Sequence, residues 1–370
     1  MPAERGAGYI IAHNASPIVG GGETWLARFL AGMQQRGHRS LFLCRNDRVA
    51  KQAEQVGVPA RVLVLGGNAM FSDAFRFARL LRSEHPDALL LTTFSKTWLG
   101  GIAGRLSRVP RVAVRVGALP RRPGARIYRI ALGRWIDAIV LNADTMRGPM
   151  IAALPSVRAE KFVTIHDGIA LEPSTRTEAD LHRELGIHPD TPLIGSLGRL
   201  VKQKRYDRLI GSMAQLPRDV HLVIAGDGAD KESLIDLARS LGIDDRVHLI
   251  GWREDTAAIL KALDVFVVSS DFEGMANVML EAMAVGIPVV STRVSGAEEA
   301  LAASSLDGPT PGIVVGFEQH EISDAVSRLL ADPSLRARMG KEGIRRVRDH
   351  FSFERMLDEW EGLFWSNFQS

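Results

Sequence analysis

Short runs of aliphatic and β-branched residues alternate with segments of helical period along almost the whole chain. YIIAH, RSLFLC and DALLLTT are examples of the first kind, and GETWLARFLAGMQQRG and SDAFRFARLLRSEH of the second. Strands that alternate with helices are typical of a parallel sheet with crossover helices. The alternation therefore predicts an α/β protein whose strands run parallel.

The alternation is interrupted once, over residues 171–192, by the polar and proline-bearing text LEPSTRTEADLHRELGIHPDTP. Such composition suits a linker with a short helix. The chain has 370 residues, more than one hydrophobic core usually serves. We therefore expect two doubly wound domains, residues 1–170 and 193–350, joined by that linker. The aromatic residues of 351–370 predict a final amphipathic helix that packs on its own domain or back on the first.

Composition excludes several classes of protein. Hydrophobic residues make up 46% and charged residues 24%, as in a soluble globular protein. Cys44 is the only cysteine, so no intramolecular disulfide can form. No apolar run approaches the ~18 residues of a membrane span. We expect a cytoplasmic protein, at most peripheral on the inner face of a membrane.

Charge is distributed unevenly. Residues 1–170 hold 24 Lys and Arg against 11 Asp and Glu, although the whole chain has a net charge of only +3. Between Asp87 and Asp137 there is no acidic residue. The basic residues there are Lys96, Arg105, Arg108, Arg111, Arg115, Arg121, Arg122, Arg126, Arg129 and Arg134. The segment is either a solvated basic face or one that meets an anionic partner.

One nearly apolar stretch, DFEGMANVMLEAMAVGIPVV at 271–290, contains three isolated polar residues. At helical spacing its methionines form a core stripe, while Asn277 and Glu281 fall together on the other side. Glu273 comes just after the strand DVFVVSS, where open α/β sheets bind ligands. A buried carboxylate needs a partner, so Glu281 either faces a cleft or meets a protein donor.

Phosphate could bind beside these carboxylates. Gly274 permits close approach, and the free N–H groups at the start of the following helix, around residues 275–277, form an anion site. Arg199 and Lys204, in SLGRLVKQKRYDRLI, also follow a strand and precede a helix. A ligand with hydroxyl groups for the glutamates and phosphates for the helix start would be a nucleotide sugar.

Other patterns are absent or weak. The turn at residues 20–22 opens a helix but gives no G-x-G-x-x-G, and GDGADKESL lacks the third glycine, so hydride transfer is disfavoured. No Asp-x-Asp metal signature occurs. Basic side chains and helix starts would then neutralise a diphosphate, and we expect activity without a metal or other cofactor. No nucleic-acid-binding module accompanies the basic segment, so nucleic acid is not an expected partner.

The motifs GRLVKQK, IAGDG, HLIGW, FEGMANVMLEAMAVGIPVV and VSGAEEAL, with GGGE near the start, closely resemble those of the retaining glycosyltransferases of family 4. The most specific sign is Glu273 and Glu281 in E-x7-E spacing. The resemblance implies the GT-B fold. In this fold two Rossmann-like doubly wound domains face each other across a cleft, the first for the acceptor and the second for the donor, and the C-terminal helix returns to the first.

The resemblance also implies roles for single residues. Glu273 would hold donor-sugar hydroxyls, Arg199 and Lys204 the diphosphate, and Glu281 the ribose. The backbone of Gly274, Met275, Ala276, Asn277 and Val278 would meet sugar and phosphate. The turn at Gly21 and Gly22 would approach from the first domain. The loop from Gly251 to Asp255, with Trp252 and Arg253, would lie near the base.

The implied activity is transfer of a sugar, with retention, from a UDP- or GDP-linked donor. The basic segment of the acceptor domain favours an anionic acceptor: a glycolipid, a lipid-linked or cell-envelope saccharide, or the membrane surface carrying it. Its candidate contacts are Arg105, Arg108, Arg111, Arg115, Arg121, Arg122 and Arg126. One departure is Val116 before Gly117, where members commonly carry histidine. A nucleotide-sugar epimerase and a catalytically silent scaffold of the same fold stay open as alternatives.

Overall fold

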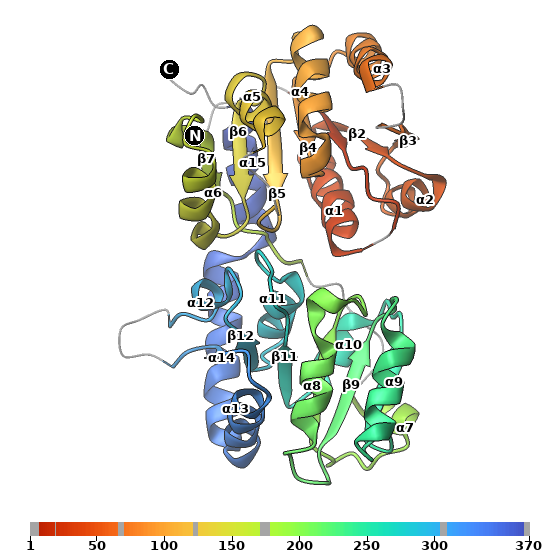
Figure 1. Cartoon of the computed structure of the whole chain (residues 1–370), viewed down its shortest axis with the longest axis vertical. Helices are drawn as coiled ribbons and strands as arrows, with labels where there is room; N and C mark the ends of the chain where they lie inside the picture. Colours follow the sequence, from red (N-terminus) through yellow and green to blue (C-terminus); the bar gives the residue numbers. More distant parts are fainter. Residues whose placement is uncertain are drawn as a thin grey trace. The chain divides into compact units, whose positions relative to one another are not determined.

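The computed structural model describes residues 7–18, 20–65, 70–120, 125–170, 178–303 and 309–365 (Figure 1). The chain divides into two compact units. The first unit comprises Met1–His166 together with Glu354–Ser370, and the second comprises Asp167–Phe353. Each contains one parallel sheet with helices packed on it, as the alternation predicts.

The sheet of the first unit has seven strands in the order β3-β2-β1-β4-β5-β6-β7, and every neighbouring pair is parallel. The strands are β1 (Tyr9–His13), β2 (Arg39–Cys44), β3 (Ala60–Val62), β4 (Ala88–Leu91), β5 (Arg111–Val116), β6 (Ala138–Leu141) and β7 (Phe162–Thr164). The central strands β1, β4 and β6 are buried along their whole length because helices cover both faces.

The helices of this unit include the last one of the chain. They are α1 (Gly21–Gln35), α2 (Asp47–Gln55), α3 (Met70–Glu84), α4 (Thr97–Leu106), α5 (Arg126–Arg134), α6 (Arg147–Ala153) and α15 (Phe353–Trp365). Trp360 of α15 is buried against Trp25 and Phe29 of α1. Arg36 holds the same helix by an ion pair of 2.7 Å to Asp358. The expectation that the C-terminal helix returns to the first domain is confirmed.

The second sheet has six parallel strands in the order β10-β9-β8-β11-β12-β13. The strands are β8 (Leu193–Leu197), β9 (His221–Ala225), β10 (Val247–Gly251), β11 (Val265–Val268), β12 (Val289–Thr292) and β13 (Gly312–Val315). Aliphatic side chains such as Ile194, Leu222 and Val267 form its core, together with apolar residues of the helices.

The helices of the second unit are α7 (Glu178–Leu185), α8 (Tyr206–Met213), α9 (Lys231–Ser240), α10 (Thr256–Lys261), α11 (Asn277–Ala284), α12 (Ala297–Ala300), α13 (Gln319–Ala331) and α14 (Pro333–His350). Helices α8 and α13 pack on each other, as do α11 and α14. Helix α7 lies in the segment interpreted as a linker and packs against α10. Among the helices described in both units, none is long and apolar enough to cross a membrane.

Both sheets reverse their strand order beside their first strand, so that β1 neighbours β4 and β8 neighbours β11. In a parallel sheet all strands end at the same edge. The loops after two such neighbours leave in opposite directions, which opens a crevice where ligands bind. This switch point positions the candidate site.

Candidate active site

Lys204 and Glu273 meet at the switch point of the second sheet. Lys204 lies in the 3-10 turn η4 (Lys202–Lys204) after β8, and Glu273 lies in the loop after β11. The Lys204 ammonium donates a hydrogen bond of 2.6 Å to Oε1 of Glu273, which also accepts one of 2.9 Å from the Ser270 hydroxyl. Only 17% and 13% of the two charged side chains are exposed. The structure thus brings together two residues that are 69 positions apart in the chain.

This ion pair fixes the positions of both side chains, and both can still form hydrogen bonds with a ligand. Both protein hydrogen bonds described for the Glu273 carboxylate end on Oε1, and carboxylate oxygens readily accept hydroxyl groups. The Lys204 ammonium has three donors and favours phosphate oxygens as strongly as a carboxylate. In a ligand that carries both kinds of group, the phosphate would therefore compete with Glu273 for the Lys204 ammonium. The hydroxyl groups of the same ligand would donate hydrogen bonds to the Glu273 carboxylate.

Gly198 at the end of β8 leaves room for the pair. Its φ is +153°, and a Cβ there would lie 3.0 Å from the Tyr206 hydroxyl and 3.3 Å from Cε of Lys204. Burial raises the pKa of Tyr206, and the negative charge of Glu273 adds to the effect. The Tyr206 hydroxyl therefore stays neutral beside the ion pair, and a larger residue at position 198 would displace Lys204.

Helix α11 provides an anion-binding start directly after Glu273. It begins at Asn277, within the predicted start around residues 275–277, and no side chain caps its first turn. The first N–H groups of a helix have no intrahelical partner, so those of Asn277 and Val278 can bind an anion. Oδ1 of Asn277 is buried and accepts no hydrogen bond within the described part of the chain.

The rest of this stretch divides as predicted into a core side and a polar side. Gly274, Met275, Ala276 and the other two methionines of the stripe are buried, whereas Glu281 is half-buried one turn after Asn277. Gly274 and Met275 are packed by the loop that ends at Gly296, because a Cβ at Gly296 would lie 2.8 Å from the Gly274 carbonyl oxygen.

The loop after β10 carries Arg253, whose guanidinium is bonded to carboxylates of the protein, and Trp252, whose side chain is exposed. Arg253 donates hydrogen bonds of 2.8 and 2.7 Å to the two oxygens of Asp255 and one of 2.6 Å to Glu184. The Asp255 carboxylate is the main cause that raises the pKa of Arg253. Trp252 is 56% exposed. Arg253 thus shapes the loop that begins at Gly251, and Trp252 presents a flat aromatic face to a ligand.

Two glycines that resembled a weak dinucleotide signature have a packing role. A Cβ at Gly226 would lie 1.9 Å from the carbonyl oxygen of Gly198, and one at Gly228 would lie 2.2 Å from that of Leu200. Gly226 has a φ of +149°. The GDG motif lets the loop after β9 press against the loop that carries Arg199 and Lys204.

Two family models match consecutive parts of the chain. The model described as "Glycosyltransferase Family 4" matches residues 19–173, and the one described as "Glycosyl transferases group 1" matches residues 177–346. Together they cover both units. The chain belongs to the family 4 glycosyltransferases.

Known relatives of this glycosyltransferase include enzymes of cell-envelope synthesis. The lipopolysaccharide core biosynthesis glycosyltransferase LpsE of Rhizobium meliloti (strain 1021) is 39% identical over 46% of this chain, and the match spans 49% of the relative. The GDP-mannose-dependent alpha-mannosyltransferase of Mycobacterium tuberculosis (strain CDC 1551 / Oshkosh) is 29% identical over 87% of each chain. The crystal structure of Anabaena HepE in complex with UDP covers 97% of this chain and 100% of HepE, with a TM-score of 0.84 and 20% identity. The fold is therefore GT-B.

The other predicted donor contacts of the glycosyltransferase lie on exposed turns. Arg199 is exposed, and it forms no ion pair with any residue that the structure describes. Gly21 and Gly22 begin α1 after the first strand, and a Cβ on either would meet nothing within 4 Å. Both positions are accessible to a ligand.

The basic segment of the first unit does not form one surface. Arg105, Arg108 and Arg111 lie between the end of α4 and the start of β5, at the amino edge of the sheet. Arg105 is paired there with Asp137 at 2.5 Å. Arg126, by contrast, begins α5 after the carboxyl end of β5 and is exposed.

Arg115 belongs to neither edge surface. It is 92% buried, and its guanidinium lies over the Trp25 ring at 3.9 Å. The reason is that helices cover both faces of β5, so a strand residue of either parity is enclosed. Arg121 and Arg122 lie outside the described residues.

Two groups near the switch points carried no sequence signal. His13 ends β1 and is fully buried, and burial lowers its pKa to about 4. Arg208 of α8 is buried and bonded to Asp271, two residues before Glu273. Such partners depend on which strands are neighbours, and that cannot be read from local patterns. Val116, where family members commonly carry histidine, is buried at the end of β5.

The described residues contain no group of three or more His, Cys, Asp or Glu side chains placed to hold a metal ion. The charges at the switch point of the second sheet include those of Arg199, Lys204 and Glu273, and the N–H groups at the start of α11 lie beside them. The arrangement can therefore accept hydroxyl groups and bind phosphate through protein groups.

Proposed function

We propose that this glycosyltransferase moves a sugar, with retention of anomeric configuration, from a UDP- or GDP-linked donor to a saccharide acceptor. The observation that carries the proposal is the 2.6 Å ion pair of Lys204 and Glu273 at the switch point of the second sheet. The uncapped start of α11 follows it within a few residues. The carboxylate can accept hydrogen bonds from hydroxyl groups, and the ammonium and the free N–H groups beside it can bind phosphate. Together they match the groups of a nucleotide-diphosphate sugar.

In this proposal each group meets one part of the donor. Glu273 accepts donor-sugar hydroxyls, Lys204 and Arg199 bind the diphosphate, and Glu281 accepts the ribose hydroxyls. The N–H groups of Asn277 and Val278 bind phosphate oxygens. Trp252 packs on the base.

The proposed chemistry is electrostatic. The bond from the anomeric carbon to the diphosphate oxygen breaks, and a bond to the acceptor oxygen forms on the same face. The acceptor proton passes to the departing diphosphate oxygen. Lys204 and Arg199 stabilise the negative charge that develops on that oxygen, and Glu273 positions the cationic sugar, so no metal is required.

The donor is tested with UDP-glucose, GDP-mannose and related nucleotide sugars. One of them should raise the unfolding temperature and release its nucleotide slowly without an acceptor. NMR of the transferred product should show the donor's anomeric configuration, and EDTA should leave the rate unchanged. Inversion would contradict the proposed mechanism, and loss of activity in EDTA that a divalent ion restores would contradict metal independence. Net conversion of a nucleotide sugar to its epimer would instead favour the isomerase alternative.

We propose an anionic acceptor, carried on a glycolipid or cell-envelope saccharide and presented at the membrane surface. Ile127 and Ile130 are exposed apolar residues of α5, which also carries the exposed Arg126 and Arg129. We call these four residues the α5 surface. Apolar and basic residues together are typical of surfaces that lie on anionic lipid, and each basic group adds about 1 kcal/mol near such a membrane. The relative in lipopolysaccharide core synthesis supports the same class of acceptor.

Flotation with vesicles tests the α5 surface. Wild-type protein should float with vesicles that contain phosphatidylglycerol and stay behind with neutral vesicles. Arg126→Glu with Arg129→Glu should abolish flotation, whereas Arg105→Glu with Arg108→Glu, at the amino edge of the same sheet, should retain it. Flotation that is independent of lipid charge would count against this surface.

A further inference from the structure

Four charged side chains form a network directly behind the Lys204 and Glu273 pair. Asp271 accepts hydrogen bonds from Arg208 at 2.8 Å and from Arg205 at 3.1 Å. Arg205 also bonds Asp207 at 3.0 Å, and Arg208 donates to the carbonyl oxygen of Ser269 at 2.7 Å. The Asp271 network, comprising Arg205, Asp207, Arg208 and Asp271, joins the start of α8 to the loop after β11.

The network lies next to the active pair in the sequence as well as in space. Arg205 follows Lys204 directly, and Asp271 precedes Glu273 by two residues. Backbone bonds support the same junction: Asp271 N–H donates to the carbonyl oxygen of Gln203 at 2.9 Å, and the Ser269 hydroxyl to that of Lys204 at 2.8 Å. The loop and the turn can therefore shift relative to each other only if the network breaks.

Two features of this network are unfavourable for the stability of the fold. Arg208 is a charged residue on a buried helix, with 7% of its side chain exposed. A buried charge is costly unless it is paired, and an apolar residue there would often be at least as stable. Arg205 has a φ of +50°, a left-handed conformation that is uncommon outside glycine. Stability alone does not explain these choices.

We propose that Arg208 is a positioning residue for sugar transfer, which acts through Asp271 and the Ser269 carbonyl. It holds the loop after β11 so that Glu273 stays within reach of both Lys204 and the donor. The inference rests on the proposed function, because Arg208 itself contacts neither member of the pair in the described hydrogen bonds.

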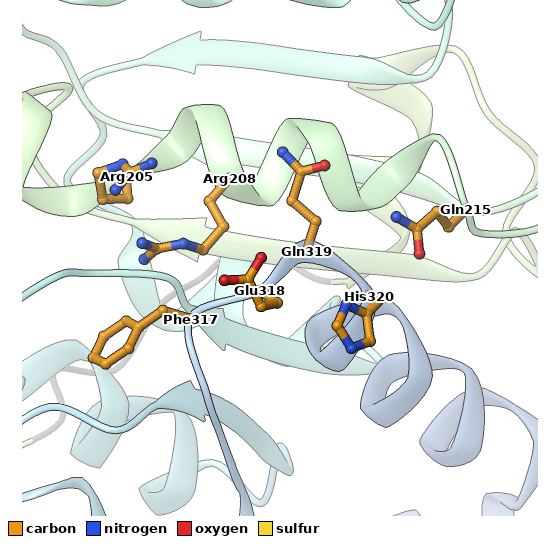
Figure 2. Close-up of a pocket in the computed structure, with 7 residues that line it drawn as sticks. All are labelled: Arg205, Arg208, Gln215, Phe317, Glu318, Gln319 and His320. Atoms are coloured by element: carbon orange, nitrogen blue, oxygen red, sulfur yellow. The ribbon is translucent and has the colours of Figure 1, made fainter.

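A pocket beside Arg208 gives solvent access to the network. It has a volume of about 520 Å³ and is lined by Arg205, Arg208, Gln215, Phe317, Glu318, Gln319 and His320 (Figure 2). The guanidinium of Arg208 lies 5.2 Å from the centre of the Phe317 ring, and Phe317 is 42% exposed. If Arg208 were shortened, a small planar cation could enter from this pocket and replace its guanidinium.

Chemical rescue therefore tests the proposal. We expect Arg208→Ala to lower kcat for nucleotide release from the donor that the wild type uses, by about 10- to 100-fold, since displaced catalytic groups lose rates of this order. KM should change less than kcat, because Lys204, Arg199 and the start of α11 still bind the diphosphate. Methylguanidinium, well below denaturing concentrations, should restore part of kcat, whereas sodium chloride at equal ionic strength should not. Arg208→Lys should be intermediate, because lysine lacks the planar fork.

Arg239→Ala is the matched control. Arg239 belongs to α9 of the same unit and is paired with an aspartate three residues earlier, at 3.5 Å. It should keep the wild-type kcat. Asp271→Asn preserves the shape of the network without its charge and should lose activity without rescue by methylguanidinium. Wild-type kcat in a folded Arg208→Ala protein, or a loss that methylguanidinium does not reverse, would overturn the proposal.

Hydrogen exchange separates this inference from the proposed function. Backbone amides of residues 269–276 should exchange faster in Arg208→Ala than in the wild type, and methylguanidinium should slow them again. This readout needs no donor. A wild type that uses no nucleotide sugar would refute the proposed function, while unchanged exchange in Arg208→Ala would refute the positioning role.

Discussion

The two sheets have the same strand order at their switch points but present different chemistry there. In the second unit the loops after β8 and β11 bring together Lys204 and Glu273, backed by the Asp271 network. In the first unit the loops after β1 and β4 are joined by neutral groups. Asn14 donates a hydrogen bond of 3.0 Å to the Thr92 hydroxyl, and the N–H of Ala15 donates one of 2.8 Å to Thr93.

This contrast separates what the fold provides from what the residues provide. The shared topology provides two equivalent crevices. The second is lined by Lys204 and Glu273, whose charges hold each other in place, as stabilisation of a leaving diphosphate requires. The first offers hydroxyl and amide groups, which suit uncharged sugar hydroxyls. Substitutions in one unit at a time can test this contrast.

The largest effect is expected from breaking the ion pair of the second switch point. Glu273→Ala and Lys204→Ala should each lower kcat on the order of 100-fold or more, because each removes a group that stabilises the transition state. Steady-state kinetics with the best donor measures the loss, and thermal unfolding shows whether the variant is folded. Wild-type turnover in either folded variant would refute the assignment.

The equivalent change in the first unit is the control for that result. Thr92→Val removes the hydrogen bond from Asn14 but no charge. One neutral hydrogen bond contributes about 1 kcal/mol, so kcat/KM should fall by no more than about 10-fold. A loss as large as that of Glu273→Ala would mean that both switch points carry the chemistry.

Glycine substitutions should separate the loops in the same way. Gly226→Ala places a Cβ 1.9 Å from a backbone oxygen, at a φ of +149°, so unfolding free energy should fall by about 2 to 3 kcal/mol. Gly22→Ala meets nothing within 4 Å and should be neutral or stabilise by up to about 1 kcal/mol. Urea titration measures both. Equal stability of the two variants would contradict the close packing of the loops after β8 and β9.

Local sequence patterns were sufficient for the fold and for the meeting of Lys204 and Glu273. The alternation of strands and helices predicts both sheets. Lys204 and Glu273 each follow a strand, and parallel strands end at one edge, so their meeting required only that β8 and β11 be neighbours. The buried methionine stripe followed from helical spacing, although Met275 lies before the helix and only Met279 and Met283 lie within it.

Contacts between residues that are distant in the chain could not be predicted from local sequence patterns. Arg208 has the spacing of an ordinary helix residue, and nothing near it shows that a carboxylate 63 positions away will pair with it. The arginines between Asp87 and Asp137 look like one patch because they are close in sequence. Helix α4 ends at the amino edge and α5 begins at the carboxyl edge, and this divides them.

A smaller effect concerns the strand ends at the two switch points. Position 13 at the end of β1 is histidine, and the corresponding end of β8 is Leu197. Buried His13 has a pKa of about 4, below the ordinary 6.5. The unfolded chain therefore binds a proton that the folded protein excludes, and His13 destabilises the fold as pH falls from about 6.5 towards 4. Between pH 7 and pH 5 the loss should be about 2 kcal/mol.

His13→Leu should remove that part of the pH dependence by making the first strand end like the second. Urea unfolding of both proteins at pH 7 and pH 5 measures it as the difference between two slopes. Carboxylates titrate in the same range, but they do so equally in the two proteins. Parallel stability profiles would mean that His13 accepts a proton in the folded state.

The smallest expected effect sharpens the division of labour within the second unit. Trp252 is exposed at the end of β10, on the far side of the sheet order from β13, and it carries no charge. If Trp252 packs on the nucleotide base, Trp252→Ala should weaken the binding of the nucleotide-sugar donor and of the nucleotide product equally. Base stacking on an aromatic residue contributes about 1 to 3 kcal/mol, and a flat, open contact should lie at the lower end, so KM should rise about 5-fold. The charged pair is untouched, so kcat should stay the same, as for loss of uniform binding.

Leu241→Ala, an exposed apolar residue after α9, is the control and should change neither constant. A fall in kcat with unchanged KM would place Trp252 with the catalytic groups, and the separation of binding and catalysis along this sheet edge would be wrong.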